Sequence, residues 1–317
     1  MAANAEAHGP HQAIDTDNAR DRFALRLFDT LWDQYCDRVE YVRTYARVVR
    51  EAGGQFVKDH ISLRTFACQR PTTGIVSLSR IFEALGYQAA NCYQFTNKHL
   101  GAIHFQHPHP EFPKIFISEL KVWELAAETQ GMVAGSLASH REPLPDSTLS
   151  SLQRIGQQDQ DEQQLMDQLV NWFTQLPWQT PDKQVVLAVN EISQYAAWVL
   201  VHGYNVNHFT SLINSHGVAA LGDIEKTIDA LKAAQVPMKA EIEGVRGSKL
   251  RQSATEAVVI DVDVCEGGQP AKMPWTYAYF ELAERGEVPD PDTGKRHRFE
   301  GFLGPQATQL FEMTKKT

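Results

Sequence analysis

The stretch DHISLRTF, residues 59–66, is the part of the sequence that most directly predicts the fold. Polar and apolar residues alternate along it, as they do in a β-strand with two different faces. Because alternate side chains of a strand point to the same side, His60, Ser62 and Arg64 share one face. At about 3.3 Å per residue, the Cα atoms of His60 and Arg64 would lie roughly 13 Å apart. Arginine binds carboxylates bidentately, so the two side chains could hold a short dicarboxylate between them.

Two further polar residues stand in apolar, strand-like runs far from this one. His208 lies within VNHFT, residues 206–210, and Glu281 lies near the end of WTYAYFEL, residues 275–282. Two histidines and one carboxylate are the smallest set that forms a facial triad on non-haem Fe(II) and leaves positions open for substrate and O2. The sequence therefore predicts an iron oxygenase if His60, His208 and Glu281 meet in space.

Each of these residues has a plainer interpretation when it is taken alone. His60 could be a hydrogen-bonded histidine on a half-exposed strand beside a solvated Arg64, and His208 could neighbour a helix cap. Glu281 could emerge into solvent at a strand end and pair with Arg285. A buried glutamate is nevertheless rare without a metal or a cation partner. The aromatic residues at alternate positions before Glu281 would share its face and line the way to its carboxylate.

The surrounding sequence predicts a mixture of helices and strands separated by glycine and proline breaks. Helical spacing of apolar residues extends over residues 22–50 (one or two helices), 77–85, 165–176, 190–201 and 223–234. Strand-like runs cover residues 87–95, 102–106, 114–120, 257–264 and 274–282.

This order of elements occurs twice, and it predicts an α+β fold. In residues 55–125 and again in residues 200–285, a histidine-bearing strand is followed by a helix and then by several strands. Two such βαβββ modules side by side would form a curved sheet, or partial barrel, like that of the vicinal-oxygen-chelate folds. We expect residues 1–20 to be a disordered tail. We expect residues 21–317 to form one catalytic domain, with a helical and linker insertion at about residues 126–200.

Other potential metal ligands occur outside the proposed triad. Glu119 closes the first module much as Glu281 closes the second, so it could be a fourth ligand, although a structural role is favoured. Four histidines fall within eleven residues: His99, His104, His107 and His109. Because prolines interrupt this segment, we expect a surface loop without the rigid geometry that a metal site requires.

The bulk composition is that of a globular protein with an acidic surface. Of the 317 residues, 43% are hydrophobic and 22% are charged, and the net charge is −9. This charge argues against nucleic acid or an anionic membrane as a partner. No apolar run is long enough to span a bilayer, and the polar N-terminal residues lack the apolar core of a secretory signal. Four cysteines without a Cys-x-x-Cys pair indicate reduced thiols and a cytoplasmic location.

Several of these segments together resemble the 2-oxoadipate dioxygenase/decarboxylase family, also called 2-hydroxyglutarate synthases. The resemblance spans roughly residues 20–315 and rests on residues 59–64 (DHISLR), 116–120 (FISEL), 207–210 (NHFT), 279–286 (YFELAERG) and 301–304 (GFLG). It implies a vicinal-oxygen-chelate-like fold. It further implies that His60, His208 and Glu281 bind Fe(II) and that Arg64 anchors the carboxylate of the substrate.

The implied reaction takes 2-oxoadipate and O2 to 2-hydroxyglutarate and CO2, with a role in lysine catabolism. Gln252 and Ser253, which precede an apolar run, are further candidates to hydrogen-bond the substrate. Two alternatives stay open. One is another metal-dependent lyase or isomerase of the same fold, with Glu119 as fourth ligand. The other is a metal- or small-molecule-binding module without turnover. The sequence does not indicate the oligomeric state.

Overall fold

The computed structural model describes residues 10–11, 13–141, 143–157 and 161–304. Nine α-helices lie within these ranges, and four of them carry an N-cap aspartate or asparagine whose side chain accepts from the first turn. The helices are α1 (Ala19–Arg38), α2 (Tyr41–Glu51), α3 (Ile75–Ala84), α4 (Ala127–Leu137), α5 (Asp146–Gln153), α6 (Glu162–Thr174), α7 (Lys183–Ile192), α8 (Gln194–His202) and α9 (Ile224–Ala233).

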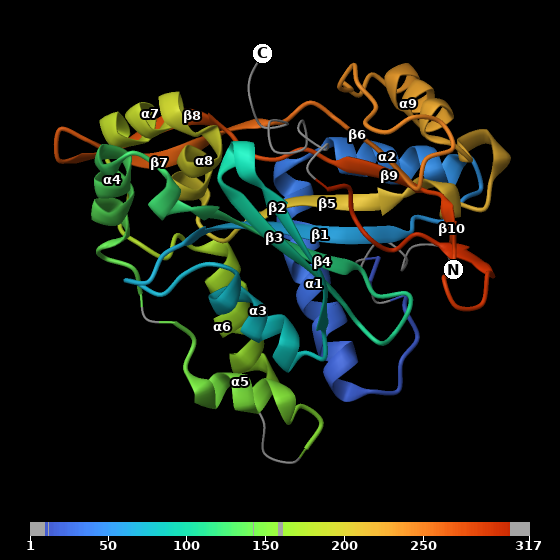
Figure 1. The fold of residues 1–317 in the computed structure, drawn as a ribbon, viewed down its shortest axis with the longest axis horizontal. Coiled ribbons are helices and arrows are strands. Elements are labelled where there is room, and N and C mark those ends of the chain that lie inside the picture. Colours follow the sequence, from blue (N-terminus) through green and yellow to red (C-terminus); the bar gives the residue numbers. More distant parts are fainter. Residues whose placement is uncertain (1–9, 12, 142, 158–160, 305–317) are drawn as a thin grey trace.

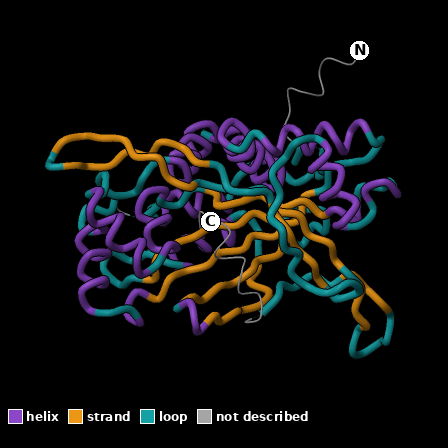
Figure 2. The backbone as a smooth tube through the Cα atoms, turned by 90° about the horizontal axis from the view of Figure 1, so that it is seen from above, coloured by secondary structure: helices purple, strands orange, loops and turns teal. Residues whose placement is uncertain are grey.

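A curved seven-stranded sheet forms the centre of the molecule, with strand order β2-β3-β4-β1-β5-β9-β6 (Figure 1). Its strands are β1 (Lys58–Ala67), β2 (Gln88–Phe95), β3 (Leu100–Gln106), β4 (Lys114–Lys121), β5 (Val206–Leu212), β6 (Leu250–Ala254) and β9 (Glu281–Arg285). Two separate hairpins are made by β7 (Val259–Glu266) with β8 (Gln269–Thr276) and by β10 (Glu287–Pro289) with β11 (Arg296–Arg298). In Figure 2 these hairpins project at opposite ends of the sheet.

Two modules meet at the middle of the sheet, but the second departs from the predicted βαβββ order: the strand expected at residues 257–264 lies in the separate β7–β8 hairpin, and β6 takes its place in the sheet. The first consists of β1, α3, β2, β3 and β4, and the second contributes β5, α9, β6 and β9. In each module the first and last strands pair in parallel, β1 with β4 and β5 with β9, while β1 and β5 pair antiparallel across the junction. The expected vicinal-oxygen-chelate-like curved sheet is therefore confirmed.

The strand predicted at residues 274–282 is not continuous. β8 ends at Thr276, and β9 begins at Glu281. In between, the carbonyl groups of Ala278 and Phe280 accept hydrogen bonds from the backbone at residues 255–258, so this stretch does not join the ladder. The expectation that Trp275, Tyr277 and Tyr279 share one strand face with Glu281 was consequently wrong. Of these three aromatic residues, only Tyr279 lines the cavity beside Glu281.

The convex face of the sheet carries the main apolar core. Phe209 of β5 packs edge-on against α1, with ring centroids 4.9 Å from Trp32 and 5.0 Å from Tyr35. His11 is fully buried in the same layer, and its Nδ1 lies 2.7 Å from Asp29 Oδ1. The disordered tail expected over residues 1–20 thus does not extend to His11, while residues 1–9 and 12 lie outside the described part of the chain.

The segment between the modules is largely helical and contains α4 to α8. Its last helix, α8, reaches the sheet, where the Tyr195 hydroxyl donates to the Ser118 carbonyl of β4 at 2.8 Å. No helix among the described residues is both long and apolar enough to cross a membrane. The curved sheet thus keeps its concave face free of helices over the centre, and that face holds the site described next (Figure 1).

Candidate metal centre

His60, His208 and Glu281 meet on the concave face of the sheet. Neighbouring strands supply them: His60 is on β1, His208 is on β5 and Glu281 is the first residue of β9. One ligand atom from each lies within 4.8 Å of the other two. The His60 Nε2 is 3.4 Å from Glu281 Oε1, and the His208 Nε2 is 3.5 Å from Glu281 Oε2. Within the described ranges, this is the single group of three or more such side chains that could hold a metal ion.

The residue before each histidine fixes the orientation of its ring. His60 Nδ1 lies 2.7 Å from Asp59 Oδ1, and His208 Nδ1 lies 2.9 Å from Asn207 Oδ1. Each oxygen accepts a hydrogen bond from the Nδ1–H, which leaves the lone pair on Nε2. Such a partner on the second ring nitrogen is the usual companion of a metal-binding histidine. The His60 Nε2 lies 3.1 Å from Thr210 Oγ1 as well as near Glu281. Burial lowers the pKa of both imidazoles, His208 the more strongly, which favours the neutral, ligating form.

Glu281 is a buried carboxylate with no Lys or Arg paired to it among the described residues. Gln252 Nε2 donates to its Oε1 at 2.6 Å, and Thr210 Oγ1 is 3.4 Å from the same oxygen. No described residue donates to its Oε2. Burial raises the pKa of Glu281 to about 8, because the charged form lacks solvation there. A divalent cation between Oε2 and the two imidazoles would supply the missing partner, so the residues fit a metal ion.

The register of the sheet shows how the two modules differ at the site. Thr210 pairs with Glu281 across β5 and β9, and Ser62 pairs with Phe116 across β1 and β4. Ser62 follows His60 by two residues, as Thr210 follows His208. Phe116 therefore occupies in the first module the position that the glutamate ligand occupies in the second. The site is left with three protein ligands and one apolar side.

Glu119 is not the counterpart of Glu281, so the correspondence drawn from element order was wrong. Glu119 Oε2 accepts from the backbone N–H of Ile75, the first residue of α3, at 2.8 Å. In the second module, Glu284 Oε2 accepts from Ile224, the first residue of α9, also at 2.8 Å. The two glutamates are equivalent caps of equivalent helices, and the expected structural role of Glu119 is confirmed.

A cavity opens beside the three ligands, with about 420 Å³ of empty space including its mouth. Its apolar wall comes from four side chains: Phe95, Phe116, Phe302 and Leu303. Its polar lining comes from the triad and from Ser62, Arg64, Ser118, Asn207, Gln252 and Tyr279. The predicted shared face of His60, Ser62 and Arg64 is thereby confirmed.

Arg64 lies at the far end of the cavity from its β1 neighbour His60. Its side chain is 2% exposed and hydrogen-bonds to Tyr279. Its guanidinium carbon is 5.0 Å from the ring centroid of Tyr195 and 5.3 Å from that of Trp198. Burial lowers the pKa of Arg64 from its usual value, but an arginine stays charged in such surroundings. A cation in an aromatic, water-poor recess is suited to bind a carboxylate.

The two remaining substrate candidates are separated by the structure. Gln252 lines the cavity, and its Oε1 is buried and accepts no hydrogen bond from the described residues. Ser253 lies outside the lining, and its hydroxyl donates to the carbonyl of Glu241 at 3.1 Å. Their alternation along β6 explains the difference, because only one of two successive residues can face the concave side.

The histidine-rich segment is not a loop throughout. His104 lies on β3 and is 2% exposed, its Nδ1 3.0 Å from the Tyr93 hydroxyl. His107 stacks on Phe112 at 4.1 Å, and the remaining two histidines are half-buried, one in a turn and the other in a bend. The loop prediction was wrong for His104, because the proline breaks begin only after β3. None of the four belongs to the metal group found among the described side chains.

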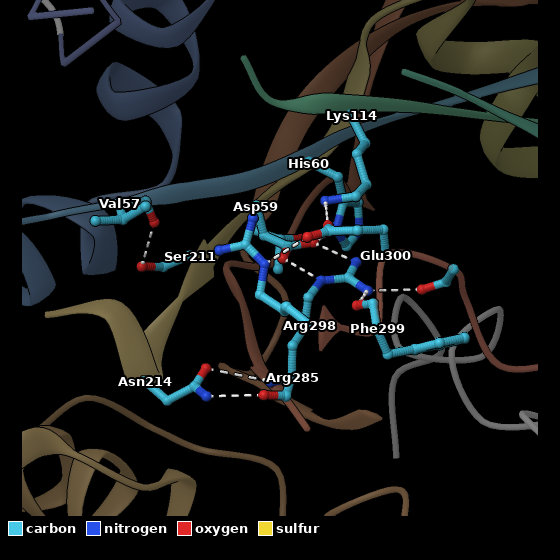
Figure 3. A network of polar contacts seen from close by, with 12 residues as sticks. Val57, Asp59, His60, Lys114, Ser211, Asn214, Arg285, Arg298, Phe299 and Glu300 are labelled. Carbon is cyan, nitrogen blue, oxygen red and sulfur yellow. Dashed lines mark hydrogen bonds and ion pairs between the residues drawn. The ribbon is translucent and has the colours of Figure 1, made fainter. Parts of the chain in front are cut away.

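Three residues that matter to the site were not singled out from the sequence. Asp59 and Asn207 orient the two histidines, and Arg285 forms an ion pair with Asp59 in place of the pair with Glu281 considered above (Figure 3). One signal was available: each histidine directly follows a residue with a carboxyl or amide group, Asp-His in one module and Asn-His in the other. No sequence pattern indicated Arg285, whose partner is 226 positions away.

The paired modules give the chain a vicinal-oxygen-chelate-like fold, and the two histidines and the glutamate form a candidate metal centre within it. A family model for 2-oxoadipate dioxygenase/decarboxylase matches residues 29–310. The chain belongs to the 2-oxoadipate dioxygenase/decarboxylase family.

Known relatives agree in sequence and in fold. A protein of Oryza sativa subsp. japonica named 2-oxoadipate dioxygenase/decarboxylase, chloroplastic/amyloplastic, is 26% identical over 339 residues, covering 99% of this chain and 84% of that protein. The fold is similar to that of the hydroxyglutarate synthase from Oryza sativa in complex with 2-oxoadipate, with a TM-score of 0.73, 24% identity, and 95% and 94% of the two chains covered. A glyoxalase-superfamily protein from Ralstonia eutropha JMP134 has a TM-score of 0.77 at 21% identity, with 95% and 89% covered.

Proposed function

We propose that this protein is an Fe(II)-dependent dioxygenase that converts 2-oxoadipate and O2 into 2-hydroxyglutarate and CO2. The observation that carries the proposal is the convergence of His60, His208 and Glu281, with ligand atoms within 4.8 Å of one another and one buried carboxylate oxygen lacking a donor. Two histidines and one carboxylate with an open side are the ligand set of non-haem Fe(II) oxygenases. The structure of the rice relative with 2-oxoadipate supports the choice of substrate.

In this proposal the protein contributes three things to the reaction. His60 and His208 bind the metal through Nε2, while Asp59 and Asn207 keep the Nδ1 protons in place. Glu281 gives up its proton when the metal binds. Bound Fe(II) supplies a Lewis acid that can be chelated by a 2-oxo acid and that activates O2.

The remaining residues orient the substrate and keep water away. Arg64 would pair with the distal carboxylate, which places the 2-oxo acid end at the metal ligands. Gln252 would hold Glu281 through Nε2 and present its free Oε1 to the cavity. The phenyl rings of Phe95, Phe116 and Phe302 would limit the water around the reacting carbon atoms. Because the ligands come from both modules, we propose that the modules and the helices between them act as one catalytic domain.

The test is anaerobic reconstitution with Fe(II), followed by addition of 2-oxoadipate and O2 while oxygen uptake and product mass are measured together. One O2 consumed for each CO2 and each 2-hydroxyglutarate would support the metal, the reaction and the substrate. His60→Ala should abolish both metal binding and turnover, and His99→Ala, on the surface beside Glu124, should change neither. Turnover without O2, or with Zn(II) in place of Fe(II), would instead indicate a lyase or isomerase.

Arg64→Ala tests how the substrate is recognised. Loss of a charge-assisted hydrogen bond of this kind costs roughly 1.5–3 kcal/mol, so kcat/KM for 2-oxoadipate should fall about 10- to 100-fold. A 2-oxo acid of similar length without the distal carboxylate should be used equally well by both proteins. Steady-state kinetics with the two substrates measures the difference. An unchanged preference would remove Arg64 from the site.

The location of the enzyme is also a proposal. All four cysteines are free thiols, which accords with a reducing compartment such as the cytoplasm. The rice relative carries a plastid name. Fractionation of cells that express the protein would decide between these compartments.

A further inference from the structure

Arg285 joins two parts of the site: the partner of a proposed metal ligand and the segment that lines the cavity. It lies on β9, four residues after Glu281, and its side chain is completely buried. On one side its guanidinium forms a bidentate ion pair with Asp59: Nε donates to Oδ2 at 2.5 Å and Nη2 to Oδ1 at 2.8 Å (Figure 3). The same Oδ1 accepts from His60 Nδ1 at 2.7 Å. The orientation of His60 thus depends on a carboxylate that Arg285 holds.

On its other side, Arg285 holds the segment that closes the cavity. Its Nη1 donates to the backbone carbonyl of Phe299 at 2.9 Å (Figure 3). The same Nη1 donates to the backbone carbonyl of Gly301 at 2.6 Å. We name residues 299–304 the closing segment. Its Phe302 lines the cavity and packs edge-on against the ring of His60, with centroids 4.8 Å apart. The guanidinium therefore makes four hydrogen bonds: two to Asp59, which orients His60, and two to backbone carbonyls of the closing segment.

Further contacts seat the closing segment independently of Asp59. The backbone N–H of Phe302 donates to the Tyr93 hydroxyl at 3.0 Å, and Glu300 forms an ion pair with Lys114 at 2.5 Å. The backbone of Arg285 is itself fixed, because its N–H and carbonyl both bond to the side-chain amide of Asn214. The backbone of Arg285 is consequently held in place, and the Tyr93 contact offers a way to loosen the closing segment without replacing either member of the ion pair.

We propose that Arg285 is a positioning residue that couples the seating of the closing segment to the orientation of the metal ligand His60. An arginine fork can satisfy a carboxylate and two carbonyl groups at once, which a point charge cannot do. When the closing segment leaves, the guanidinium loses two of its acceptors, and its hold on Asp59 loosens. Because coupling between two sites is reciprocal, binding of a metal by His60 should also stabilise the closing segment in its seated position. This inference rests on the proposed triad.

The first test compares Arg285→Gln with a control variant, Arg251→Gln, in which another buried arginine is replaced. Arg251 on β6 is also buried and pairs with Glu225 and Glu284, away from the closing segment. We expect Arg285→Gln to weaken Fe(II) binding by the metal-free protein about 10- to 100-fold, as measured by anaerobic titration. It should also speed hydrogen exchange at the Phe299 and Phe302 amides. Arg251→Gln should leave both quantities near their wild-type values; equal effects of the two variants would overturn the proposal.

Two further variants separate coupling from simple loss of structure. Arg285→Lys keeps a positive charge for Asp59 but lacks the fork, so metal affinity should recover in part while exchange of the closing segment stays fast. Tyr93→Phe removes the acceptor for the Phe302 amide and replaces neither Arg285 nor Asp59. By loosening the closing segment it should still weaken Fe(II) binding several-fold. Wild-type affinity in Tyr93→Phe, with the closing segment exchanging freely, would overturn the coupling even if Arg285→Gln failed to fold.

Linkage supplies a readout that needs no variant. Fe(II) added to the wild type should slow exchange of the closing segment, and this protection should vanish in Arg285→Gln. Equal exchange with and without bound metal would overturn the inference alone. If His60→Ala bound metal as tightly as the wild type, the triad itself would be refuted, and the proposed function and the inference would both fall.

Discussion

The two histidines of the site differ in the charge of the groups that orient them. Asp59 is an anion whose pKa, despite a burial that would raise it, is held well below its usual value by Arg285 and Lys114. Asn207 is a neutral amide at the matching position of the other module. A carboxylate partner makes an imidazole a stronger donor to a metal than an amide does. His60 is therefore the more basic ligand of the pair, although the two rings occupy equivalent strands.

Replacing Asn207 tests this interpretation of the residue pair. Asn207→Leu removes the acceptor for His208 Nδ1 and should weaken Fe(II) binding about 10- to 100-fold, because the imidazole is then free to turn. Asn207→Asp restores an acceptor and should bind within roughly threefold of the wild type. Anaerobic metal titration gives both affinities, and thermal unfolding controls for loss of structure. Equal affinity of Asn207→Leu and the wild type would show that the amide does not orient His208.

At the scale of elements, each module uses a glutamate on its last strand to begin its own helix. Helix α3 follows Gly74, which offers no side-chain cap, and Glu119 takes that role from β4. The carboxylate accepts an N–H that would otherwise lack an acceptor and faces the positive end of the helix dipole. This hydrogen bond thus links the first residue of α3 to β4, the last strand of the module.

Glu119→Ala should lower the free energy of unfolding without affecting the metal. Loss of an N-terminal cap costs roughly 0.5–2 kcal/mol. Glu119→Gln, which keeps an acceptor, should recover part of this loss. Chemical denaturation measures the stability, and Fe(II) titration of both variants should match the wild type. A large fall in metal affinity in Glu119→Ala would favour the lyase-type alternative, in which this residue is a ligand.

Helix α8 gives the fold a dependence on pH. His202 at its last position is 4% exposed, lies 2.9 Å from the Thr276 carbonyl, and has its pKa lowered to about 3 by burial. The unfolded chain, in which histidine titrates near 6.5, binds this proton more readily than the folded chain. Stability contributed by the neutral ring is therefore complete above about pH 6.5 and is lost as the pH falls toward 3.

His202→Gln, which keeps a donor for Thr276, should flatten this dependence. Between pH 6 and pH 5 the wild type should lose about 1 kcal/mol more unfolding free energy than the variant, since one proton contributes roughly 1.4 kcal/mol per pH unit. Urea denaturation at both pH values measures the difference. Parallel curves for the two proteins would mean that His202 does not titrate on unfolding.

For the whole molecule, a metal bound between β1, β5 and β9 would join the two modules. Fe(II) at 100 times its dissociation constant should raise the free energy of unfolding by about 2.7 kcal/mol. Anaerobic chemical denaturation with and without Fe(II) measures this increase. His60→Ala should show none of it, and His99→Ala should show all of it. Stabilisation of His60→Ala to the same extent would place the metal elsewhere.

Residue types and periodicity predicted much of this architecture but not its register. The period of two along β1 placed His60 and Arg64 on one face, and the repeated order of elements gave the paired modules. The prediction that Glu119 corresponds to Glu281 was wrong. The strand pairing, which the sequence does not reveal, shows that Phe116 occupies the position in the first module that Glu281 occupies in the second. The sequence did not predict Asp59 and Asn207 as partners of the histidines, because adjacent residues of a strand face opposite sides. In the structure each of the two side chains nevertheless bends toward the imidazole of the next residue.

The correspondence between Phe116 and Glu281 bears on how a catalytic site of this kind could arise. A chain descended from a duplicated half would begin with two identical sets of ligands, and such a symmetric site would supply two histidines and two carboxylates to its metal. Exchange of one carboxylate for a phenyl ring breaks that symmetry and frees coordination space on one flank. The apolar layer behind the sheet need not change. Divergence at a single position between the two halves would thus be enough to open one further coordination position on the metal.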